Sequence, residues 1–448
     1  MRALGSRDNN RNEIMSLNVQ MNSRRGRVRR RSLVSNGGKA LSAAFMVALL
    51  GGCDGILDVS LPGQTEIGEL ANPRGAQLLV VSAQGDFECA YNRYVRQSGL
   101  ISGELLGSLR AITDIPYMER NVLPIHTGFG ESNCASGASL YTPLAIARFA
   151  ADDATARVEE FSAAELPNRE ALLARAALFA GYSYAVLGEG FCEAAFDGGP
   201  ALTPQQIFEL AENRFTKAIE AASVSGQSDL LNAARVGRAR VRLPLGNAAG
   251  AAQDASQVPP GFTFYVTRSN AEGRRQNQVY MDNYRSETVT VGTKYWNVEW
   301  EGVPDPRVAV EDMDRVTGGD NQTRLVRQLK YTAPEAPIRL ASYTEAQLIR
   351  AEVEGGQVAV GIINALHAAV GLPPFVSDDP EEIRQQVIEQ RRRELFLEGH
   401  RMGDLRRFGG FAEWAEHGQP HPYANLTFGS TSCFPLPDVE RANNPNIS

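Results

Sequence analysis

The chain has 448 residues, of which 43% are hydrophobic and 22% charged, and its glycine and proline contents are ordinary. This composition is typical of a globular protein and excludes a disordered, collagen-like or low-complexity chain. The formal net charge is −7, but residues 1–52 hold ten Lys/Arg against two acidic residues, so residues 53–448 have a net charge of −15. Because binding to nucleic-acid phosphates needs a basic face, this acidic body argues against a nucleic-acid partner.

Residues 1–52 are expected to be a lipoprotein signal peptide. A basic stretch precedes an apolar run of about eleven residues, 40–50, which is too short to cross a bilayer as a helix. The run ends in L-G-G-C, which resembles a bacterial lipobox, so we expect Cys53 to be lipidated and to anchor the protein to a membrane. A signal-peptidase site that precedes a cysteine by chance is the alternative. Translation from Met15 or Met21 would give a signal of more usual length.

Apolar residues recur at helical spacing through most of the chain. Several of these patterns begin with a capping side chain followed by proline, as in Asn72-Pro73 and Asp379-Pro380, which is a preferred helix start. Paired helices with short connections are typical of tetratricopeptide-like arrays, so we predict a mainly α fold with a tetratricopeptide-like body. The predicted helices span about 73–84, 87–106, 142–161, 168–187, 204–222, 229–243, 344–355, 357–370 and 380–398.

Residues 256–340 interrupt the helical pattern with prolines, glycines and short alternating runs, so we predict a large irregular insertion with short strands. The segment is rich in aromatic residues. These rings either fill the core beneath a long loop or form a platform that stacks on the apolar faces of sugar rings. In the second case, the loop 108–133 supplies further rings. The candidate ligand-binding residues are Tyr284, Arg285, Tyr295, Trp296 and Trp300, with Tyr117 and Phe129 from the second loop.

Four cysteines remain besides Cys53, and an even number in an exported chain suggests two disulfides. Four cysteines allow three pairings. We favour Cys89–Cys134, which would close a local loop, and Cys192–Cys433, which would tie a helix end to the C-terminal segment. The chain has no C-x-x-C motif and its five histidines are scattered, so we expect neither a metal site nor a cofactor.

The stretch from Ile388 to Gly410 predicts a charged helix and its exit, with Gly399 as the helix stop. Its charges lie next to the apolar positions instead of opposite them, which predicts a partly buried Arg/Glu/Asp network. Such a network fixes the position of a helix more often than it performs chemistry. The residues expected in it are Arg393, Glu394, Glu398, Arg401, Asp404 and Arg406.

The same stretch resembles the signature of the SusD/RagB family of outer-membrane nutrient-binding lipoproteins. It reads R-R-R-E-L over 391–395, E-G-H-R over 398–401 and D-L-R-R-F-G over 404–409, where the family has R-R-x-E-L, E-G-x-R and D-L-R-R-x-G. Other segments resemble family motifs in the family's order, so the resemblance covers nearly all of residues 53–448. These segments are 54–59, 175–191, 207–221, 233–246, 343–352 and 434–445.

The resemblance implies a SusD-like fold in three regions: a helical region over 53–255, the aromatic-rich segment over 256–340, and a helical region over 341–448 packed on the same body. It also implies a non-catalytic lipoprotein at the cell surface. Such a protein binds an oligosaccharide or a peptide and acts as the lid of a SusC-like TonB-dependent transporter in the outer membrane.

Two other functions are weighed against this one. A helical-repeat scaffold lipoprotein for envelope assembly would bind no small ligand, but it has no need of the aromatic insertion. A glycoside hydrolase would need a pair of suitably placed carboxylates, and no motif in the sequence marks such a pair. The sequence also contains no G-x-S-x-G, P-loop or H-E-x-x-H motif, so we expect no enzymatic activity.

Overall fold

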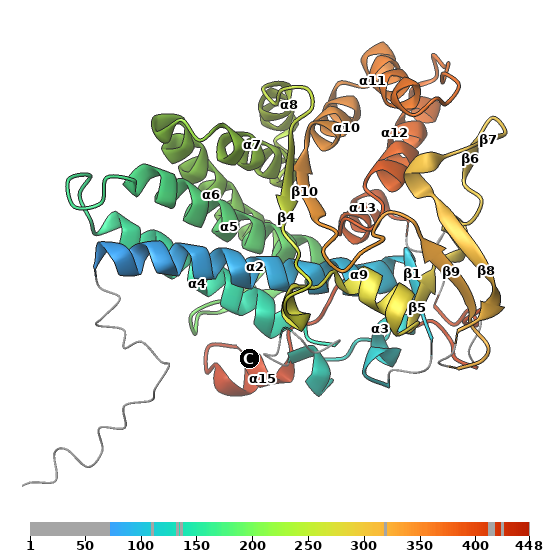
Figure 1. The fold of residues 1–448 in the computed structure, drawn as a ribbon, viewed down its shortest axis with the longest axis horizontal. Coiled ribbons are helices and arrows are strands. Elements are labelled where there is room, and N and C mark those ends of the chain that lie inside the picture. Colours follow the sequence, from blue (N-terminus) through green and yellow to red (C-terminus); the bar gives the residue numbers. More distant parts are fainter. Residues whose placement is uncertain are drawn as a thin grey trace, which may run out of the picture. The chain divides into compact units, whose positions relative to one another are not determined.

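The computed structural model of the protein describes residues 72–108, 112–130, 134, 138–317, 320–410, 417–422 and 425–447. The expected signal peptide and the expected lipidation site, Cys53, lie outside these residues. All described residues belong to one unit of the chain, which begins at Thr65. Helices dominate this unit and its strands are short, so the predicted mainly α fold is confirmed (Figure 1).

Helix α2 (Pro73–Ser102) lies at the centre of the fold and is almost entirely buried in its second half. The Asn72 side chain accepts a hydrogen bond from the Gly75 amide (3.0 Å) and caps its start. Gly103 ends it in a left-handed conformation, with φ at 76°.

A single helix forms where the sequence predicts two, over 73–84 and 87–106. Gly85 lies between the two predicted helices, and a glycine inside a helix costs only about 1 kcal/mol relative to alanine. The buried face that starts at Phe87 packs against the rest of the fold, and this packing outweighs that cost.

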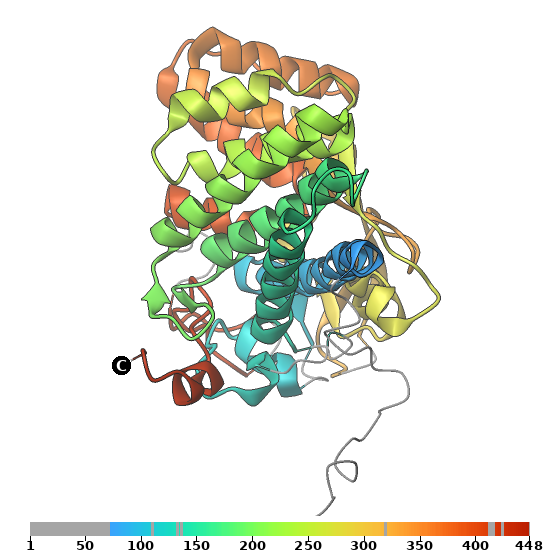
Figure 2. The same ribbon diagram turned by 90° about the vertical axis from the view of Figure 1, so that its left-hand side faces the viewer.

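Helices α4 to α8 form an array in which each helix packs on the next, seen from the side in Figure 2. The array continues beyond the insertion, because α10 packs on α7 and α8 and is followed by α11 and α12. The predicted tetratricopeptide-like body is therefore present, with α8 as a helix that the sequence pattern does not indicate. The bounds are α4 Tyr141–Glu159, α5 Arg169–Gly190, α6 Pro204–Ser225, α7 Ser228–Arg242, α8 Ala248–Ser256, α10 Tyr343–Glu354, α11 Gly356–Ala369 and α12 Pro380–Glu394.

Helix α5 is the core helix of this array. Gly181 in α5 and Gly237 in α7 both face the Phe215 ring of α6, and a Cβ atom on Gly181 would lie 2.7 Å from that ring. The three helices therefore approach more closely than alanine at these positions would allow. Among the described residues, α5 is also the one helix long and apolar enough to cross a membrane, but 83% of its most apolar window is buried in the fold. We assign it to the core.

The insertion leaves the array and returns to it at one place, because strand β4 (Thr263–Val266) pairs antiparallel with β10 (Ile338–Ser342). Between them, β5 (Val289–Val291) pairs with β1 (Leu105–Gly107), which follows α2. The other strand pairs are β2 Ala194–Ala195 with β3 Ala201–Leu202, β6 Glu299–Trp300 with β7 Val303–Pro304, and β8 Val310–Val316 with β9 Arg324–Gln328. The remaining helices are α3 Ile115–Met118, α9 Gln278–Tyr280, α13 Arg401–Phe408 and α15 Asp438–Asn443.

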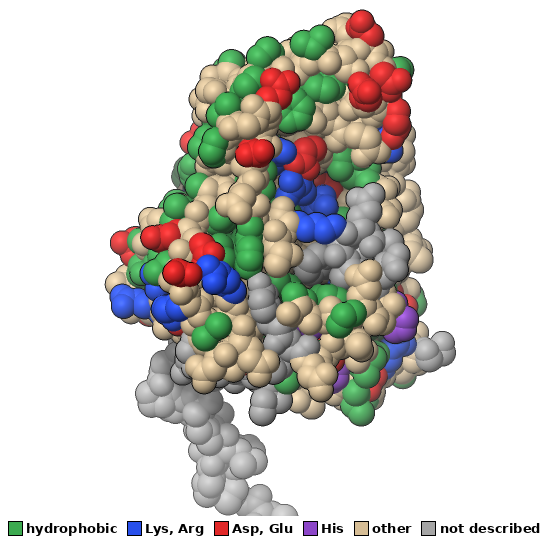
Figure 3. Space-filling model, turned by 90° about the vertical axis from the view of Figure 1, so that its right-hand side faces the viewer, with side chains coloured by type: hydrophobic (Ala, Val, Ile, Leu, Met, Phe, Trp, Pro, Cys, Tyr) green, Lys and Arg blue, Asp and Glu red, His purple; other side chains and the backbone are tan. Residues whose placement is uncertain are grey.

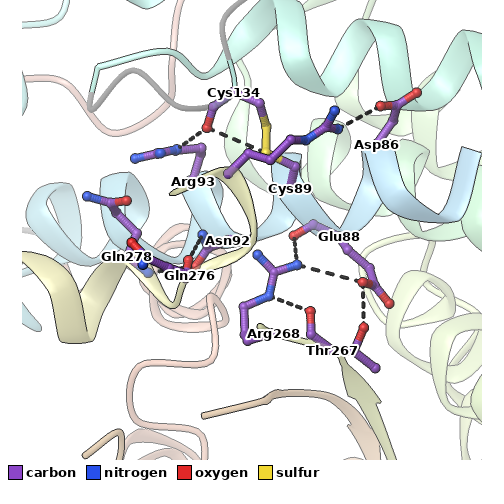
Figure 4. Close-up of a disulfide and its surroundings, with 11 residues drawn as sticks. Asp86, Glu88, Cys89, Asn92, Arg93, Cys134, Thr267, Arg268, Gln276 and Gln278 are labelled. Atoms are coloured by element: carbon purple, nitrogen blue, oxygen red, sulfur yellow. Dashed lines mark hydrogen bonds and ion pairs between the residues drawn. A yellow bond between two sulfur atoms is a disulfide. The ribbon is translucent and has the colours of Figure 1, made fainter. Parts of the chain in front are cut away.

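Both expected disulfides are present. Cys89–Cys134 joins α2 to the segment before α4, and the Cys134 carbonyl accepts a hydrogen bond from Arg93 Nε (2.7 Å; Figure 4). Cys192–Cys433 joins the end of α5 to the C-terminal segment. A covalent link between cysteines 241 positions apart restricts the unfolded chain and so favours the folded state.

A buried ion pair joins the array across the insertion. Arg240 of α7 donates from Nε and Nη2 to the two carboxylate oxygens of Glu345 in α10, at 2.7 and 2.8 Å. Arg240 Nη2 also donates to the Leu340 carbonyl of β10 (2.7 Å). The two charged side chains are only 5% and 2% exposed. Buried charges are stable only when fully paired, and this pair is bidentate with an additional carbonyl acceptor.

Replacing Arg240 alone leaves the Glu345 carboxylate buried without a cation. We therefore expect Arg240→Met to lower the free energy of unfolding by about 3–5 kcal/mol, and Arg240→Met/Glu345→Leu to recover most of that loss. Urea denaturation followed by circular dichroism measures both changes. The exposed pair Arg384–Glu381 provides the control, because Arg384→Met is expected to cost less than about 1 kcal/mol. An equal loss in Arg240→Met and in this control would contradict the assigned role.

Candidate functional site

The charged C-terminal stretch forms two helices, α12 and α13, instead of one helix over 380–398. Between them lie Leu397 and Gly399, both in the left-handed conformation, with φ at 56° and 83°. A leucine in this conformation is strained, and it is held there because its amide donates to Glu104 Oε1 (2.7 Å) while its carbonyl accepts from the Tyr331 hydroxyl (2.9 Å). The predicted position of the helix end is therefore wrong, since partners distant in sequence fix a tight turn there.

Most charges of this stretch lie in buried or half-buried pairs, but Arg401, which was expected in the network, pairs with no described residue. Arg391 and Asp404 join α12 to α13 through two hydrogen bonds of 2.9 Å. Burial alone would raise the pKa of Asp404, but Arg391 and Arg407 hold it below its ordinary value. Arg406 instead donates to backbone carbonyls at the end of α5. Four pairs connect the stretch to the insertion: Arg393 with Asp305 (3.1 Å), Glu394 with Arg307 (2.9 Å), and Glu398 with both Lys330 (2.5 Å) and Arg339 (2.9 Å).

An open cleft of about 1060 Å³, here named the α12 cleft, lies along α12. Two aromatic residues line it, Phe375 and Tyr295. The Tyr295 ring stacks on Phe396 with centroids 4.6 Å apart, and the Arg392 guanidinium lies 4.9 Å from its centroid. The cleft is lined by Ser102, Gly103, Lys294, Tyr295, Phe375, Asp379, Glu381, Glu382, Gln385, Gln386, Ile388, Glu389, Arg392 and Arg401.

Several polar groups of the α12 cleft lack a partner within the part of the chain that the structure describes. The hydroxyl of Ser102 and the amide nitrogen of Gln386 are buried without a hydrogen bond. Arg401 forms neither a hydrogen bond nor an ion pair with any described residue. Buried polar groups without partners are costly, so these are the groups that hydroxyl and carbonyl groups of a ligand would satisfy.

Charge is unevenly distributed along this cleft. Its basic residues are Lys294, Arg392 and Arg401, and exposed acidic residues, including Glu381 and Glu382, come from the first turn of α12. Figure 3 shows Lys and Arg side chains gathered near the centre of one face, with Asp and Glu side chains above them. A cleft with both signs of charge suits a polar ligand of low net charge better than a polyanion.

Comparison with known proteins identifies the family. The sequence model described as the SusD family matches residues 248–448, which include α12 and α13. The fold is shared over most of the chain with a SusD superfamily protein from Bacteroides vulgatus, with a TM-score of 0.65 and 15% identity over 85% of this chain and 98% of that one. Residues 248–448 of the chain match the SusD family, and the fold over most of the chain is that of a SusD superfamily structure. The resemblance seen in its sequence is thereby confirmed.

Two further solved structures share the SusD fold. Surface glycan-binding protein A from Bacteroides thetaiotaomicron has a TM-score of 0.65 and 14% identity, over 84% of this chain and 98% of that chain. A SusD-like carbohydrate binding protein from Bacteroides vulgatus has a TM-score of 0.60 and 13% identity, over 84% of this chain and 97% of that chain. No curated protein sequence matches this chain. At such low identities the structures show a common fold and no more.

The aromatic candidates of this SusD-family protein do not form one platform. Tyr295 lines the α12 cleft but is only 2% exposed, so it offers little of its ring to a ligand. Trp300 is half-buried and packs on Phe375 (6.1 Å between centroids), which also lines the cleft. Its buried indole nitrogen has no hydrogen-bond partner among the described residues. Trp300 is therefore the second candidate that the fold brings close to the cleft.

The other candidates lie outside the α12 cleft. Trp296 donates its indole N–H to the carbonyl of residue 291 (2.9 Å), and Tyr284 donates its hydroxyl to the carbonyl of residue 328 (2.7 Å). Arg285 is exposed but does not line the cleft. Tyr117 and Phe129 are each 1% exposed and lie in the hydrophobic core, so the idea that their loop forms a second binding arm is corrected: both rings are needed for packing.

Sequence reasoning did not select several cleft residues as ligand contacts, among them Ser102, Lys294 and Gln386. Lys294 directly precedes the candidate Tyr295, and this adjacency is the one feature of the sequence that could have marked it as a ligand contact. Gln386 belongs to a helix whose polar side would ordinarily face solvent, and Ser102 lies at the end of a helix far away in sequence. No local pattern marks either residue, because the cleft exists only once the insertion lies beside α12.

Glu104 follows cleft residue Gly103 and is 1% exposed. Burial raises the pKa of its carboxyl group to about 7, although the Leu397 amide and Arg401 act in the opposite direction. One carboxyl oxygen accepts the Leu397 amide, while the other is buried without a partner among the described residues. This carboxyl group therefore holds a proton in the folded protein at pH values where it would be ionised in the unfolded chain.

Between about pH 4.5 and pH 7 the folded state binds more protons than the unfolded state, so the free energy of unfolding falls as the pH rises. Over this pH window the contribution of Glu104 to the free energy of unfolding falls by up to about 3 kcal/mol. We expect Glu104→Gln to abolish that fall. Urea denaturation at several pH values measures it. Glu189, whose pKa burial also raises to about 7, keeps its own contribution in this variant. An unchanged pH profile would contradict the assignment.

Proposed function

We propose that this SusD-family protein binds a glycan in the α12 cleft and does not hydrolyse it. The observation that carries the proposal is the open cleft of about 1060 Å³ along the family's signature helix. Ser102, Gln386 and Arg401 offer polar groups without partners among the described residues, and Phe375, backed by Trp300, offers apolar surface. Mixed polar and apolar contacts of this kind suit a saccharide. The shared fold with proteins described as glycan-binding and carbohydrate binding supports this ligand class.

The carboxylates of the cleft support binding over hydrolysis. A hydrolase needs a general acid whose pKa is raised, placed across the scissile bond from a second free carboxylate. Glu389 accepts hydrogen bonds from Arg392 and Arg393, and these arginines hold its pKa below its ordinary value in spite of burial. Asp379 caps α12, and Glu381 pairs with an arginine of the same helix. These carboxylates are already engaged in structural contacts.

We expect Arg401→Ala to weaken glycan binding about tenfold or more, because a hydrogen bond from a charged donor is worth roughly 1.5–3 kcal/mol. A glycan array with the purified protein identifies a saccharide, and isothermal titration calorimetry then compares the variants. Arg74→Ala is the matched control, since it removes the same charge from an exposed position on α2 outside the cleft. Equal affinities of the two variants for the glycan would show that the glycan does not bind in the α12 cleft. Release of reducing ends from the glycan would refute the non-catalytic role.

We further propose that the protein is lipid-anchored at Cys53 on the cell surface and acts as the lid of a SusC-like TonB-dependent transporter in the outer membrane. The lipobox-like sequence supports the anchor, and the match of residues 248–448 to the SusD family supports the transporter. A scaffold lipoprotein for envelope assembly remains the competing function, and the open, incompletely satisfied cleft favours ligand binding over it.

Affinity purification of the tagged, lipidated protein from gently solubilised outer membranes, followed by mass spectrometry, tests this partnership. We expect a β-barrel transporter in a stoichiometric amount, and we expect the same partner with the Arg401→Ala variant, because the cleft contact concerns the glycan. Recovery of envelope-assembly factors without a transporter would favour the scaffold and rule out the lid.

A further inference from the structure

A second pocket, of about 220 Å³, lies between the helical array and α13 and shares no lining residue with the α12 cleft. We name it the Glu189 pocket. Its apolar wall includes Phe208, Leu243 and Ile349 from three helical segments of the array. Glu189 lies at the end of α5, and a Cβ atom added to Gly403 in α13 would lie 3.5 Å from the Cγ atom of Glu189. The pocket is too small for an oligosaccharide but large enough for a small molecule.

Two opposite charges line this pocket without pairing with each other. Neither the Glu189 carboxylate nor the Arg406 guanidinium forms an ion pair with any side chain that the structure describes. Arg406 is held in place by its hydrogen bonds to the backbone carbonyls of Glu189 (2.6 Å) and Phe191 (3.1 Å). Burial raises the pKa of Glu189 and lowers that of Arg406, as expected for half-buried charges that lack an ion-pair partner.

The other charges of the Glu189 pocket are matched within the protein. Its remaining arginines each have a carboxylate partner: Arg240 with Glu345, Arg391 with Asp404, and Arg407 with Glu352. The pocket therefore has one unpaired acid and one unpaired base, and a ligand of zero net charge would keep it neutral.

His400 supplies a third polar group. It is 4% exposed, lines the pocket, and its ring makes no hydrogen bond to a described residue. Burial and the surrounding arginines, Arg240 first among them, lower its pKa well below the ordinary value. The imidazole is therefore neutral at pH 7 and has one N–H donor and one acceptor. An unpartnered side chain buried to this degree at the edge of a pocket is a ready contact for a ligand.

We propose that the Glu189 pocket binds a free α-amino acid with an apolar side chain. The ligand ammonium contacts Glu189, its carboxylate accepts hydrogen bonds from Arg406 and His400, and its side chain packs on Phe208 and Leu243. The ammonium of a zwitterion pairs with Glu189 and its carboxylate pairs with Arg406, while the net charge of the pocket is unchanged. A sugar would leave both charges without a counter-ion, and a simple carboxylic acid would place a second negative charge beside Glu189.

Titration of the full chain with L-leucine at pH 8, above the pKa of Glu189, tests the proposal by calorimetry and by the shift in melting temperature. We expect leucine to bind and to raise the melting temperature. N-acetyl-leucine, which lacks the ammonium, and leucinamide, which lacks the carboxylate, are each expected to bind about tenfold more weakly or worse. Glucose and butyrate are expected not to bind. Binding of either one in place of leucine, or equal binding of N-acetyl-leucine, would overturn the proposal.

Glu189→Gln is the decisive variant. Burial already disfavours the charged form of this side chain, so we expect the variant to fold with an undiminished melting temperature and to lose leucine binding about tenfold or more. Glu209→Gln is the matched control, because it removes the same charge from an exposed position on α6 outside the pocket. Undiminished leucine binding in Glu189→Gln would show that the ligand binds elsewhere. Glycan binding by the α12 cleft is expected to be unchanged in both variants, so the two proposals fail independently.

Discussion

The ion pair between Arg240 and Glu345 is the interaction on which the rest of this fold depends. An array of helices is stable because each helix buries its apolar face on the next, and a long insertion between two neighbours would separate them. Here the neighbours are α8 and α10, and they still pack together. The pairing of β4 with β10 returns the chain to its starting point, and Arg240 binds both Glu345 in α10 and the Leu340 carbonyl in β10. The Tyr182 ring, 5.3 Å from the guanidinium, completes the surroundings of this charge.

This arrangement explains why the α12 cleft lies where it does. The array sets the position of α12, and the insertion supplies the residues that face it, such as Lys294 and Tyr295. Ion pairs between the two parts, Arg393 with Asp305 and Glu394 with Arg307, hold one against the other. The frame is thus fixed by buried charge pairs, while the lining of the cleft combines exposed positions such as Lys294 and Glu382 with buried ones such as Ser102 and Gln386. Changes in the lining would alter what is bound without disturbing the frame.

Much of the fold could be predicted from the sequence because helices leave local signals. The cap-then-proline start at Asn72-Pro73 and the periodic apolar positions locate most helices to within a few residues. The break in that pattern locates the insertion. Two predicted helix boundaries were wrong because contacts between distant residues set them. The helix α2 continues through Gly85. The helix expected to reach Gly399 ends earlier, since Glu104 binds the Leu397 amide.

The candidate site was harder to predict than the fold, for a related reason. An aromatic residue has the same local signal whether its ring faces a ligand or the core, so Tyr117 and Phe129 resemble Tyr295 in the sequence and differ only in where the fold places them. The cleft is an assembly of four segments, namely the end of α2, the insertion, the stretch from Phe375 to Arg392, and α13, and its polar groups are ordinary residues such as Ser102 and Gln386. Only their burial without partners distinguishes them, and burial is a property of the assembled fold.

The three consecutive arginines of the signature show how one short motif serves all of these roles. Successive residues of a helix point about 100° apart, so side chains at 391, 392 and 393 face three different surroundings. Arg391 binds Asp404 and joins α12 to α13, next to the Glu189 pocket. Arg392 lies over the Tyr295 ring in the α12 cleft, and Arg393 binds Asp305 in the insertion. Because the planar guanidinium can pair with a carboxylate, stack on a ring and donate to carbonyls, arginine suits all three positions where lysine would suit one at most. The motif is therefore best understood as the junction at which the array, the insertion and both pockets meet.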